Sequence, residues 1–233
     1  MKHSISSFAA ALILLFAASD PRLVHAEDVL YKIDFSTAPP GDAMPWLKAN
    51  KFEFKLDFED LHPRIENGAL RISTDVAMAG VAGIELKDRE IHGAKKLRII
   101  WGVDHFPEGA DWDNGVNRLA IGVMVSFGHE RLSSGLPFGI YAAPCFICPF
   151  IGSKEAEGKV YTGRFWKLGG RYISCNTQKT GDVLTTEMDI DKKFQELFGK
   201  TPAPFVSAFG IQMNSKSTKG KAAAFIRSIE FLK

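Results

Sequence analysis

The densest group of polar side chains lies in the segment VDHFPEGADWDNGVNR, residues 103–118, between two strongly apolar stretches. It contains acids, an amide, a histidine, an aromatic ring and an arginine. Ligand sites are commonly carried by loops that a rigid scaffold holds in place. The segment therefore predicts a ligand-binding site made by Asp104, His105, Trp112, Asp113, Asn114 and Arg118.

Calcium is one ligand that this loop could take. Calcium binds roughly six to eight oxygen atoms, and Asp111 and Asp113 with Asn114 can supply some of them. The spacing matches only part of a calcium loop, because Gly115 stands at the fifth position and Gly122 at the twelfth. A calcium ion on Asp111 and Asp113 is one hypothesis, and no other cofactor is predicted. The alternative is a solvated loop whose acids cap turns.

The same residues raise an enzymatic alternative. In glycoside hydrolysis an acid and a base lie about 5 to 10 Å apart across the scissile bond, a role open to Asp111 and Asp113 only if they straddle a sugar. His105 beside Asp104 could instead be the base of a lyase. The chain has no Gly-x-Ser-x-Gly, His-Glu-x-x-His or phosphate-loop motif, which removes most support for the common hydrolase and nucleotide-binding classes.

Aromatic side chains could provide a stacking surface for a sugar. An exposed Trp or Tyr offers a flat apolar face with a polar edge. Trp112 stands in the polar loop, although large aromatic side chains are usually buried, so packing is the alternative for it. Tyr161 is counted among the binding residues, and Tyr141 and Trp166 lie on similar predicted strands. We expect the core to contain Trp46, Trp101 and Phe165.

Three cysteines are present: Cys145, Cys148 and Cys175. The segment APCFICPFIG has prolines on both sides of Cys-x-x-Cys, which predicts a rigid loop. In an oxidising compartment the favoured prediction is one structural disulfide among the three, with its pairing open. Redox catalysis lacks the βαβ setting of thioredoxin-like sites, and a three-thiol metal site is a further alternative.

The flanking segments show the two-residue hydrophobic period of half-buried strands. KKLRIIWGV and RLAIGVMVSF predict two central strands on either side of the polar loop. FEFKLDF predicts a strand with Phe52, Phe54, Leu56 and Phe58 on one side, and RIENGALRI predicts a hairpin that turns at Asn67-Gly68. Further strands are predicted at residues 29–35, 136–142, 160–168, 172–175, 183–189, 205–213 and 222–232.

One helix is predicted, over DKKFQELFGK in the C-terminal part. Asp191 is its predicted N-cap, Phe194, Leu197 and Phe198 face the sheet, and Gly199 ends it. About ten strands with turns between them, and no linker or repeat, predict one all-β domain over residues 27–233. Its expected architecture is a jelly-roll-like β-sandwich.

Four stretches carry a resemblance to a known family: LRIIWGV, DWDNGVNRLAIGVMV, the run from Asp189 to Thr218, and AAAFIRSIEFL. Over roughly residues 45 to 232 they resemble a bacterial exported family, number 3047 among the domains of unknown function. The resemblance implies a β-sandwich and no established activity. Asp113-Asn114 stands where two acids are expected, and Asn214-Ser215-Lys216 where the family turn is rich in aspartate, so a metal or polar site built from those acids is weakened.

The N-terminal segment has the features of an export signal. Lys2 and His3 precede the apolar run FAAALILLFAA, and Val24-His25-Ala26 provides a small-x-small exit. Residues 1–26 are therefore predicted to be a secretory signal peptide. A membrane-spanning helix needs ~20 apolar residues, more than this run has, although a retained anchor is the alternative. The mature protein is expected to be periplasmic or secreted and not membrane-spanning.

The charges are balanced and interspersed. The chain has 29 basic and 27 acidic residues, and its pI is about 8.4. Nucleic-acid-binding domains usually have a basic face and a pI above about 9, so nucleic acid is not a predicted partner. We predict an exported non-catalytic binding protein for a carbohydrate or another small envelope ligand. The alternatives are a polysaccharide-acting enzyme, either a lyase or a glycosidase, and a structural accessory protein of the envelope.

Overall fold

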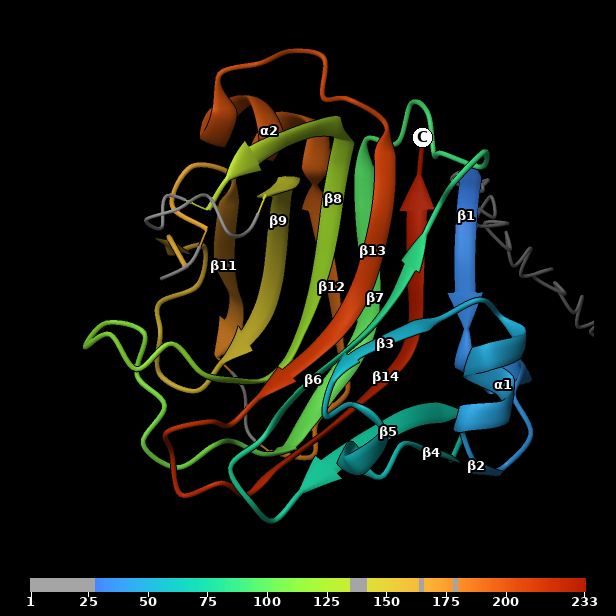
Figure 1. Ribbon diagram of the computed structural model, residues 1–233, viewed down its shortest axis with the longest axis vertical. Helices are drawn as coiled ribbons and strands as arrows, with labels where there is room; N and C mark the ends of the chain where they lie inside the picture. Colours follow the sequence, from blue (N-terminus) through green and yellow to red (C-terminus); the bar gives the residue numbers. More distant parts are fainter. Residues whose placement is uncertain (1–27, 135–141, 164–165, 178–179) are drawn as a thin grey trace, which may run out of the picture.

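The computed structural model describes residues 28–134, 142–163, 166–177 and 180–233. In this part of the chain, two seven-stranded sheets pack face to face as a β-sandwich (Figure 1). The predicted all-β, jelly-roll-like architecture is thereby confirmed. The predicted signal peptide, the predicted strand at 136–141, and the side chains of Tyr141 and Phe165 lie outside the described residues.

Sheet A has six strands in one path and a seventh, β1, that pairs with β14. The strands in path order are β12 (Leu184–Asp189), β7 (Lys96–His105), β14 (Ala222–Leu232), β5 (Ala69–Thr74), β4 (Arg64–Glu66) and β2 (Gly41–Asp42), with β1 at Val29–Asp34. The predicted hairpin is confirmed, because β4 and β5 turn at Asn67 and Gly68, whose φ angles are 52° and 68°. These positive angles are those of a tight two-residue turn.

Sheet B contains the remaining seven strands. In order they are β10 (Val160–Tyr161), β11 (Gly170–Thr177), β9 (Ala142–Gly152), β8 (Leu119–Ser133), β13 (Val206–Asn214), β6 (Ala79–Glu85) and β3 (Glu53–Leu56). β9 and β11 are parallel, whereas the other neighbours in the sheet are antiparallel. The main core lies between the two sheets.

The alternating residues of the two central strands fill this core as predicted, except Leu119, which belongs to an aromatic cluster on the outer face of sheet B. From β7 and β8 it receives Leu97, Ile99, Trp101, Val103, Ile121, Val123, Val125 and Phe127. Burial of each such side chain contributes ~1.5 to 3 kcal/mol relative to exposure. The indole Nε1 of Trp101 donates a hydrogen bond to Thr186 Oγ1 at 2.8 Å, so the buried ring leaves no unsatisfied donor.

Two helices accompany the sheets. The predicted one is α2 (Ile190–Phe198), which ends at Gly199. Its N-cap is Asp189, not the predicted Asp191, because the Asp189 carboxylate accepts a hydrogen bond from Lys192 N, whereas Asp191 accepts one from Ala203 N. α1 (Met44–Ala49) was not predicted, and the short 3₁₀ turns are η1 (Phe35–Thr37) and η2 (Glu59–Leu61). No described helix is long and apolar enough to cross a membrane.

Two predicted strands are shorter than expected. β3 ends at Leu56, which has a φ of 59° and is 68% exposed, so it does not join the apolar side with Phe52 and Phe58. The positive φ breaks the alternation, and Phe58 reaches the core from the start of η2 instead. Of the strand predicted at residues 160–168, the described part contains only β10.

The Cys-x-x-Cys segment is a strand and not the predicted loop. It forms β9, between β8 and β11 in sheet B. The pairing jumps from Phe127 opposite Cys145 to Arg131 opposite Pro144, so β8 bulges beside this proline. A bulge interrupts the ladder of backbone hydrogen bonds, which accommodates a residue without an N–H donor.

The predicted disulfide is absent, and all three cysteines are buried free thiols. Cys145 and Cys148 are three positions apart on one strand, so their side chains point to opposite faces of sheet B. Cys145 accordingly belongs to the core between the sheets, and Cys148 to an aromatic cluster on the outer face. Phe146, the residue after Cys145, lies opposite Gly170 of β11, and Cys175 lies well beyond Gly170 along that strand. This separates it along the strand from Cys145.

Candidate functional site

The predicted polar loop folds over the outer face of sheet B. Its Trp112 is only 5% exposed and belongs to a cluster with Leu119, Phe146, Cys148, Phe150, Tyr161 and Tyr172. Trp112 stacks on Phe150 with ring centroids 4.7 Å apart. Its Nε1 donates to Arg118 O at 2.8 Å, and its backbone N–H donates to Glu155 Oε1 at 3.1 Å. Trp112 is therefore a packing residue and not an exposed stacking surface.

Tyr161 is similarly occupied. Its hydroxyl donates to Asp113 Oδ1 at 2.5 Å, and the ammonium of Lys159 lies 5.5 Å from the ring centroid. Lys159 Nζ is also 2.8 Å from Asp113 Oδ1. Burial, and then the bond to Asp113, raise the pKa of Tyr161. These contacts tie the predicted binding residues Tyr161 and Asp113 to each other.

The two acids predicted to bind calcium each face a lysine. Asp111 Oδ2 lies 2.6 Å from Lys154 Nζ, and Asp111 also accepts hydrogen bonds from the backbone and side-chain amides of Asn114. Lys154, followed by Asn114, lowers the pKa of Asp111 to about 2. The described residues contain no group of three His, Cys, Asp or Glu side chains that could hold a metal. The carboxylates of Asp111 and Asp113 are therefore engaged by lysines of the protein itself.

The remaining predicted residues lie apart from these. Asp104 Oδ2 is 2.5 Å from Arg71 Nη1, and Asp104 alternates with the core residue Val103 on β7, which puts it on the outer face of sheet A. His105, the last residue of β7, pairs with Ala223 of β14 at an irregularity in the register. Arg118 donates to the backbone oxygens of Asn117 and Lys216. The predicted residues do not converge on one site, and the His105–Asp104 pair of a lyase is not assembled.

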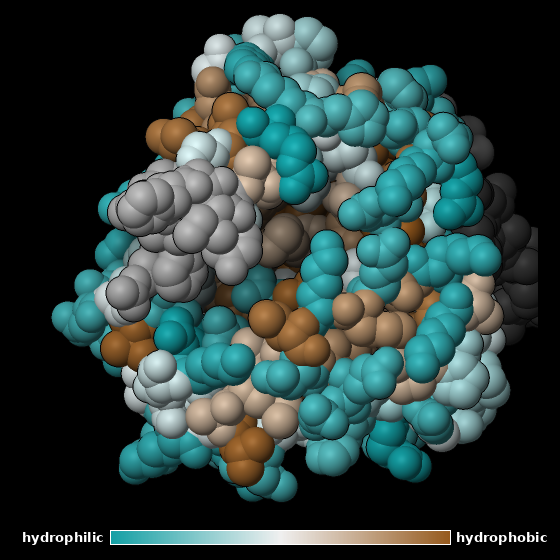
Figure 2. All heavy atoms as spheres, in the orientation of Figure 1, coloured by the Kyte–Doolittle hydropathy of each residue, from teal (hydrophilic) through white to brown (hydrophobic). Residues whose placement is uncertain are grey.

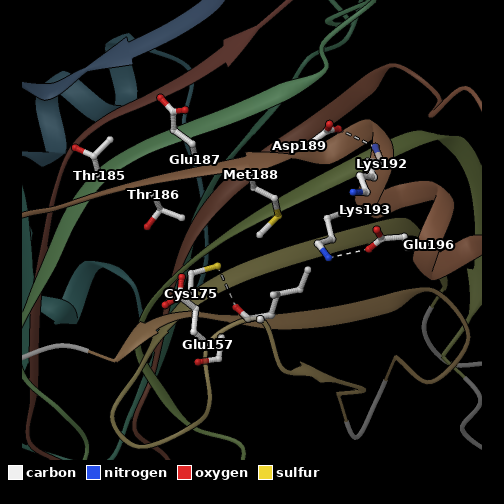
Figure 3. A pocket seen from close by; sticks show the side chains of 13 residues that line it. Glu157, Cys175, Thr185, Thr186, Glu187, Met188, Asp189, Lys192, Lys193 and Glu196 are labelled. Carbon is white, nitrogen blue, oxygen red and sulfur yellow. Dashed lines mark hydrogen bonds and ion pairs between the residues drawn. The ribbon is translucent and has the colours of Figure 1, made fainter.

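A cleft that the sequence did not indicate lies at the open edge of the sandwich, between β11 and β12 and beside α2 (Figure 3). Its volume is about 520 Å³. The lining residues are Glu157, Gly158, Ile173, Ser174, Cys175, Thr185, Thr186, Glu187, Met188, Asp189, Lys192, Lys193 and Glu196. They come from four separate segments of the chain. The one feature among them that a local sequence pattern could indicate is the N-cap of α2 at Asp189.

The apolar part of the cleft lies between the sheets. Figure 3 shows Thr186 and Met188 pointing from β12 toward Cys175, while Glu187 points away on the other side of the strand. This alternation follows from the two-residue period of a strand. Among the described strands β12 pairs only with β7, and side chains on both of its faces reach the cleft.

Charged side chains surround this apolar part. Lys193 Nζ lies 2.7 Å from Glu196 Oε2 and lowers the pKa of that carboxyl. Glu187 Oε1 lies 2.6 Å from Arg98 Nε on the neighbouring strand β7. Glu157 and Lys192 form no ion pair with any residue in the described part of the chain. They are thus the two charged groups available to a ligand.

The Cys175 thiol is unreactive in this setting. Burial, and then the charge of Glu157, raise the pKa of its thiol to about 12. Its Sγ donates to Ile173 O at 3.6 Å. The thiolate is the form that attacks electrophiles and binds metals. The cleft therefore offers an apolar sulfur surface and no cysteine nucleophile near neutral pH.

The middle of β8 and β13 presents no acid on the outer face of sheet B. Figure 2 shows hydrophilic residues over most of this side of the molecule, with apolar side chains gathered in the middle. Positions that alternate with core residues on β8 and β13 are Gly122, Met124, Ser126, Ala208, Gly210 and Gln212. Glycoside hydrolysis commonly uses two carboxyl groups that face each other. These six positions supply none.

Comparison with solved structures finds proteins whose backbones partly resemble that of this chain. No family model matches the chain, and a search of curated proteins found no match. The carbohydrate recognition domain of Emp46p, in its potassium-bound form, is 10% identical with a TM-score of 0.42, over 88% of this chain and 98% of that one. The catalytic domain of Humicola grisea Cel12A is 9% identical with a TM-score of 0.37, over 87% and 96%. The glycoside hydrolase domain of Endo-D from Streptococcus pneumoniae R6 is 11% identical with a TM-score of 0.35, over 78% and 20%.

Proposed function

We propose that the chain is an exported, non-catalytic binding protein that takes a carbohydrate in the cleft between β11, β12 and α2. One observation carries the proposal: a cleft of about 520 Å³ joins an apolar floor to a rim of hydroxyls, carboxylates and ammonium groups. Ligand pockets commonly measure roughly 300 to 1,000 Å³ and combine apolar walls with a few polar groups. A sugar of one or two rings matches this size and mixture.

The chemistry of a sugar suits the groups that remain available. Glu157 can accept hydrogen bonds from sugar hydroxyls, and Lys192 can donate to ring and hydroxyl oxygens. The C–H face of a sugar can pack on Met188 and Ile173, which line the cleft. Binding would thus need no movement of the ion pairs that Glu187 and Glu196 already make.

The same groups favour binding over catalysis. A glycosidase needs one carboxyl that keeps its proton near neutral pH, which requires a raised pKa. Lys193 lowers the pKa of Glu196, and Asp189 is engaged as the N-cap of α2. Cys175 keeps its proton and cannot serve as a nucleophile. An enzyme acting on polysaccharide remains the alternative that an assay must exclude.

A glycan array probed with the mature protein tests the proposal. We expect a defined set of glycans to bind, and expect Glu157→Gln combined with Lys192→Gln to weaken binding about tenfold or more, the loss of ~1.4 kcal/mol. Glu53→Gln combined with Lys55→Gln, on the opposite edge of sheet B, removes the same two charges and should bind as the parent does. Absence of any glycan bound at millimolar concentration, or equal loss in the control, would overturn the proposal.

Two further experiments address catalysis and calcium dependence. Incubation with the bound polysaccharides should release no new reducing ends, and their appearance would establish the enzymatic alternative. Chelation of calcium should leave binding unchanged, because Asp111 and Asp113 are already paired with lysines.

Export has its own test. We propose that residues 1–26 are removed and that the mature protein is periplasmic or secreted. Mass spectrometry of the exported protein should find Glu27 as its first residue. An intact Met1 in a membrane fraction would support the retained anchor instead.

A further inference from the structure

A second hollow lies on the outer face of sheet A. One of its lining residues, Ile100 of β7, pairs with Thr185 of the edge cleft, so the two are neighbours on the sheet. The volume of this hollow is about 300 Å³, and its other walls come from β1, from β14 and from the turn between β4 and β5. The side chains that matter for its chemistry are Lys32, Asp34, Asn67, Arg227, Ser228 and Glu230. None of them belongs to the cleft proposed above, so the inference stands independently of that function.

A bulge in β14 creates the hollow. Ile226 pairs with Trp101 of β7, and Ser228 pairs with the adjacent Ile100, so Arg227 is an extra residue between them. A bulge of this kind bends the strand locally and redirects a side chain. Arg227 is exposed as a result, although its neighbours Ile226 and Ser228 are buried.

The bulge also leaves a polar group without a partner. Ser228 is only 4% exposed, and its Oγ makes no hydrogen bond. Buried hydroxyls are nearly always hydrogen-bonded, so an unpaired one at the wall of a hollow calls for a partner. A ligand in the hollow can provide that partner.

The acids in the hollow already have cation partners, whereas Arg227 has none among the described residues. Lys32 Nζ lies 3.0 Å from Asp34 Oδ2 and 3.1 Å from Glu230 Oε1. Arg98 Nη1 lies 3.2 Å from Glu230 Oε2. Arg98 also pairs with Glu187 of β12, so Lys32, Arg98 and the acids form one network. Arg227 forms no ion pair with any residue that the structure describes, and an anion is the partner that its charge lacks.

We propose that this hollow binds a small carboxylate. The planar guanidinium of Arg227 matches a carboxylate through two parallel N–H donors. The Ser228 hydroxyl and the Asn67 amide can donate further hydrogen bonds to the same ligand. Its volume admits a single sugar ring, so the carboxylate belongs either to a uronic acid or to a simple carboxylic acid.

Titration of ¹⁵N-labelled mature protein with glucuronate, glucose and acetate tests the proposal and separates the two sources. Glucuronate should shift the backbone amides of Arg227 and Ser228, and glucose should not. Acetate binding as tight as that of glucuronate would indicate a simple carboxylic acid. Acetate binding at least tenfold weaker would indicate a uronic acid. Equal shifts with glucose and glucuronate, or no shift with either carboxylate at tens of millimolar, would overturn the proposal.

Variants distinguish the site from general charge attraction. Arg227→Gln should weaken glucuronate binding at least tenfold without changing the fold, since the side chain is exposed. Lys221→Gln removes the same charge from an exposed position just before β14 and should bind as the parent does. Ser228→Ala should weaken binding by a smaller factor. Equal losses in the Lys221 and Arg227 variants would show nonspecific attraction and sink the inference.

Discussion

Trp112 lies nearly parallel to Phe150, with ring centroids 4.7 Å apart and ring planes 24° apart. One ring belongs to the loop between β7 and β8, and the other to the outer face of β9. This contact fastens the most polar loop of the chain to sheet B. The acids around Trp112 then serve the loop itself, through the pairs Asp111–Lys154 and Asp113–Lys159.

Replacement of Trp112 should therefore affect stability and not binding. Trp112→Ala should lower the free energy of unfolding by about 3 to 5 kcal/mol, the usual range for removal of a large buried aromatic. Trp112→Phe keeps one aromatic ring for packing and loses the N–H bond to Arg118 O and the second ring, so its loss should be smaller than that of the alanine variant. Urea denaturation measures both. A loss below 1 kcal/mol for the alanine variant, with lost glycan binding, would restore the stacking-surface hypothesis.

Acid should weaken this loop in a defined pH range. Lys154 lowers the pKa of Asp111 from 3.8 to about 2. A carboxyl whose pKa is lower in the folded state contributes stability above its unfolded pKa, and loses it as the pH falls toward the folded value. Asp111→Asn should therefore make stability less dependent on pH between about 4 and 2. Asp75→Asn, at an exposed position without an ion pair among the described residues, is the control, and identical pH profiles for both variants would contradict this role.

The cysteines should be protected from reagents in the folded protein. Burial raises the pKa of all three thiols, that of Cys175 to about 12. Because the thiolate is the reactive form, iodoacetamide should label none of them rapidly at neutral pH. Labelling of all three after unfolding in guanidinium, counted by mass spectrometry, is the matched control. A mass deficit of two hydrogens with one labelled cysteine would instead indicate a disulfide.

The sequence allowed much of the fold to be predicted, because hydrophobic alternation is a local property. It marked β7, β8, β13 and β14 by their buried alternating residues, and it marked α2 by the three-and-four spacing of Phe194, Leu197 and Phe198. It failed at Leu56, where a positive φ ends β3, and at the Cys-x-x-Cys segment, where a bulge in β8 beside Pro144 lets a proline-flanked run pair as a strand. Neither feature has a local signature.

The candidate sites were less predictable, because they depend on pairing between distant segments. The edge cleft exists only because β12, at the end of sheet A, lies beside β11, next to the end of sheet B. Conversely, Asp104 and Trp112 are near in sequence but lie on different sheets, with Asp104 bound to Arg71 and Trp112 packed on Phe150. Density of polar residues along the chain therefore marked a loop that needs internal bonds, and not a ligand site.

Two buried serines should respond to alanine in opposite directions. Ser215 is fully buried, and its Oγ accepts from Met78 N at 3.2 Å and donates to nearby carbonyl oxygens. Ser215→Ala leaves the Met78 N–H without this acceptor and should cost about 1 to 3 kcal/mol. Ser228 Oγ has no partner to lose, so Ser228→Ala removes an unsatisfied hydroxyl and should be neutral or stabilising by about 1 kcal/mol. Thermal melting without ligand compares the two variants. A loss at Ser228 as large as that at Ser215 would mean that its hydroxyl is already satisfied, and the carboxylate site on sheet A would lose one of its two supports.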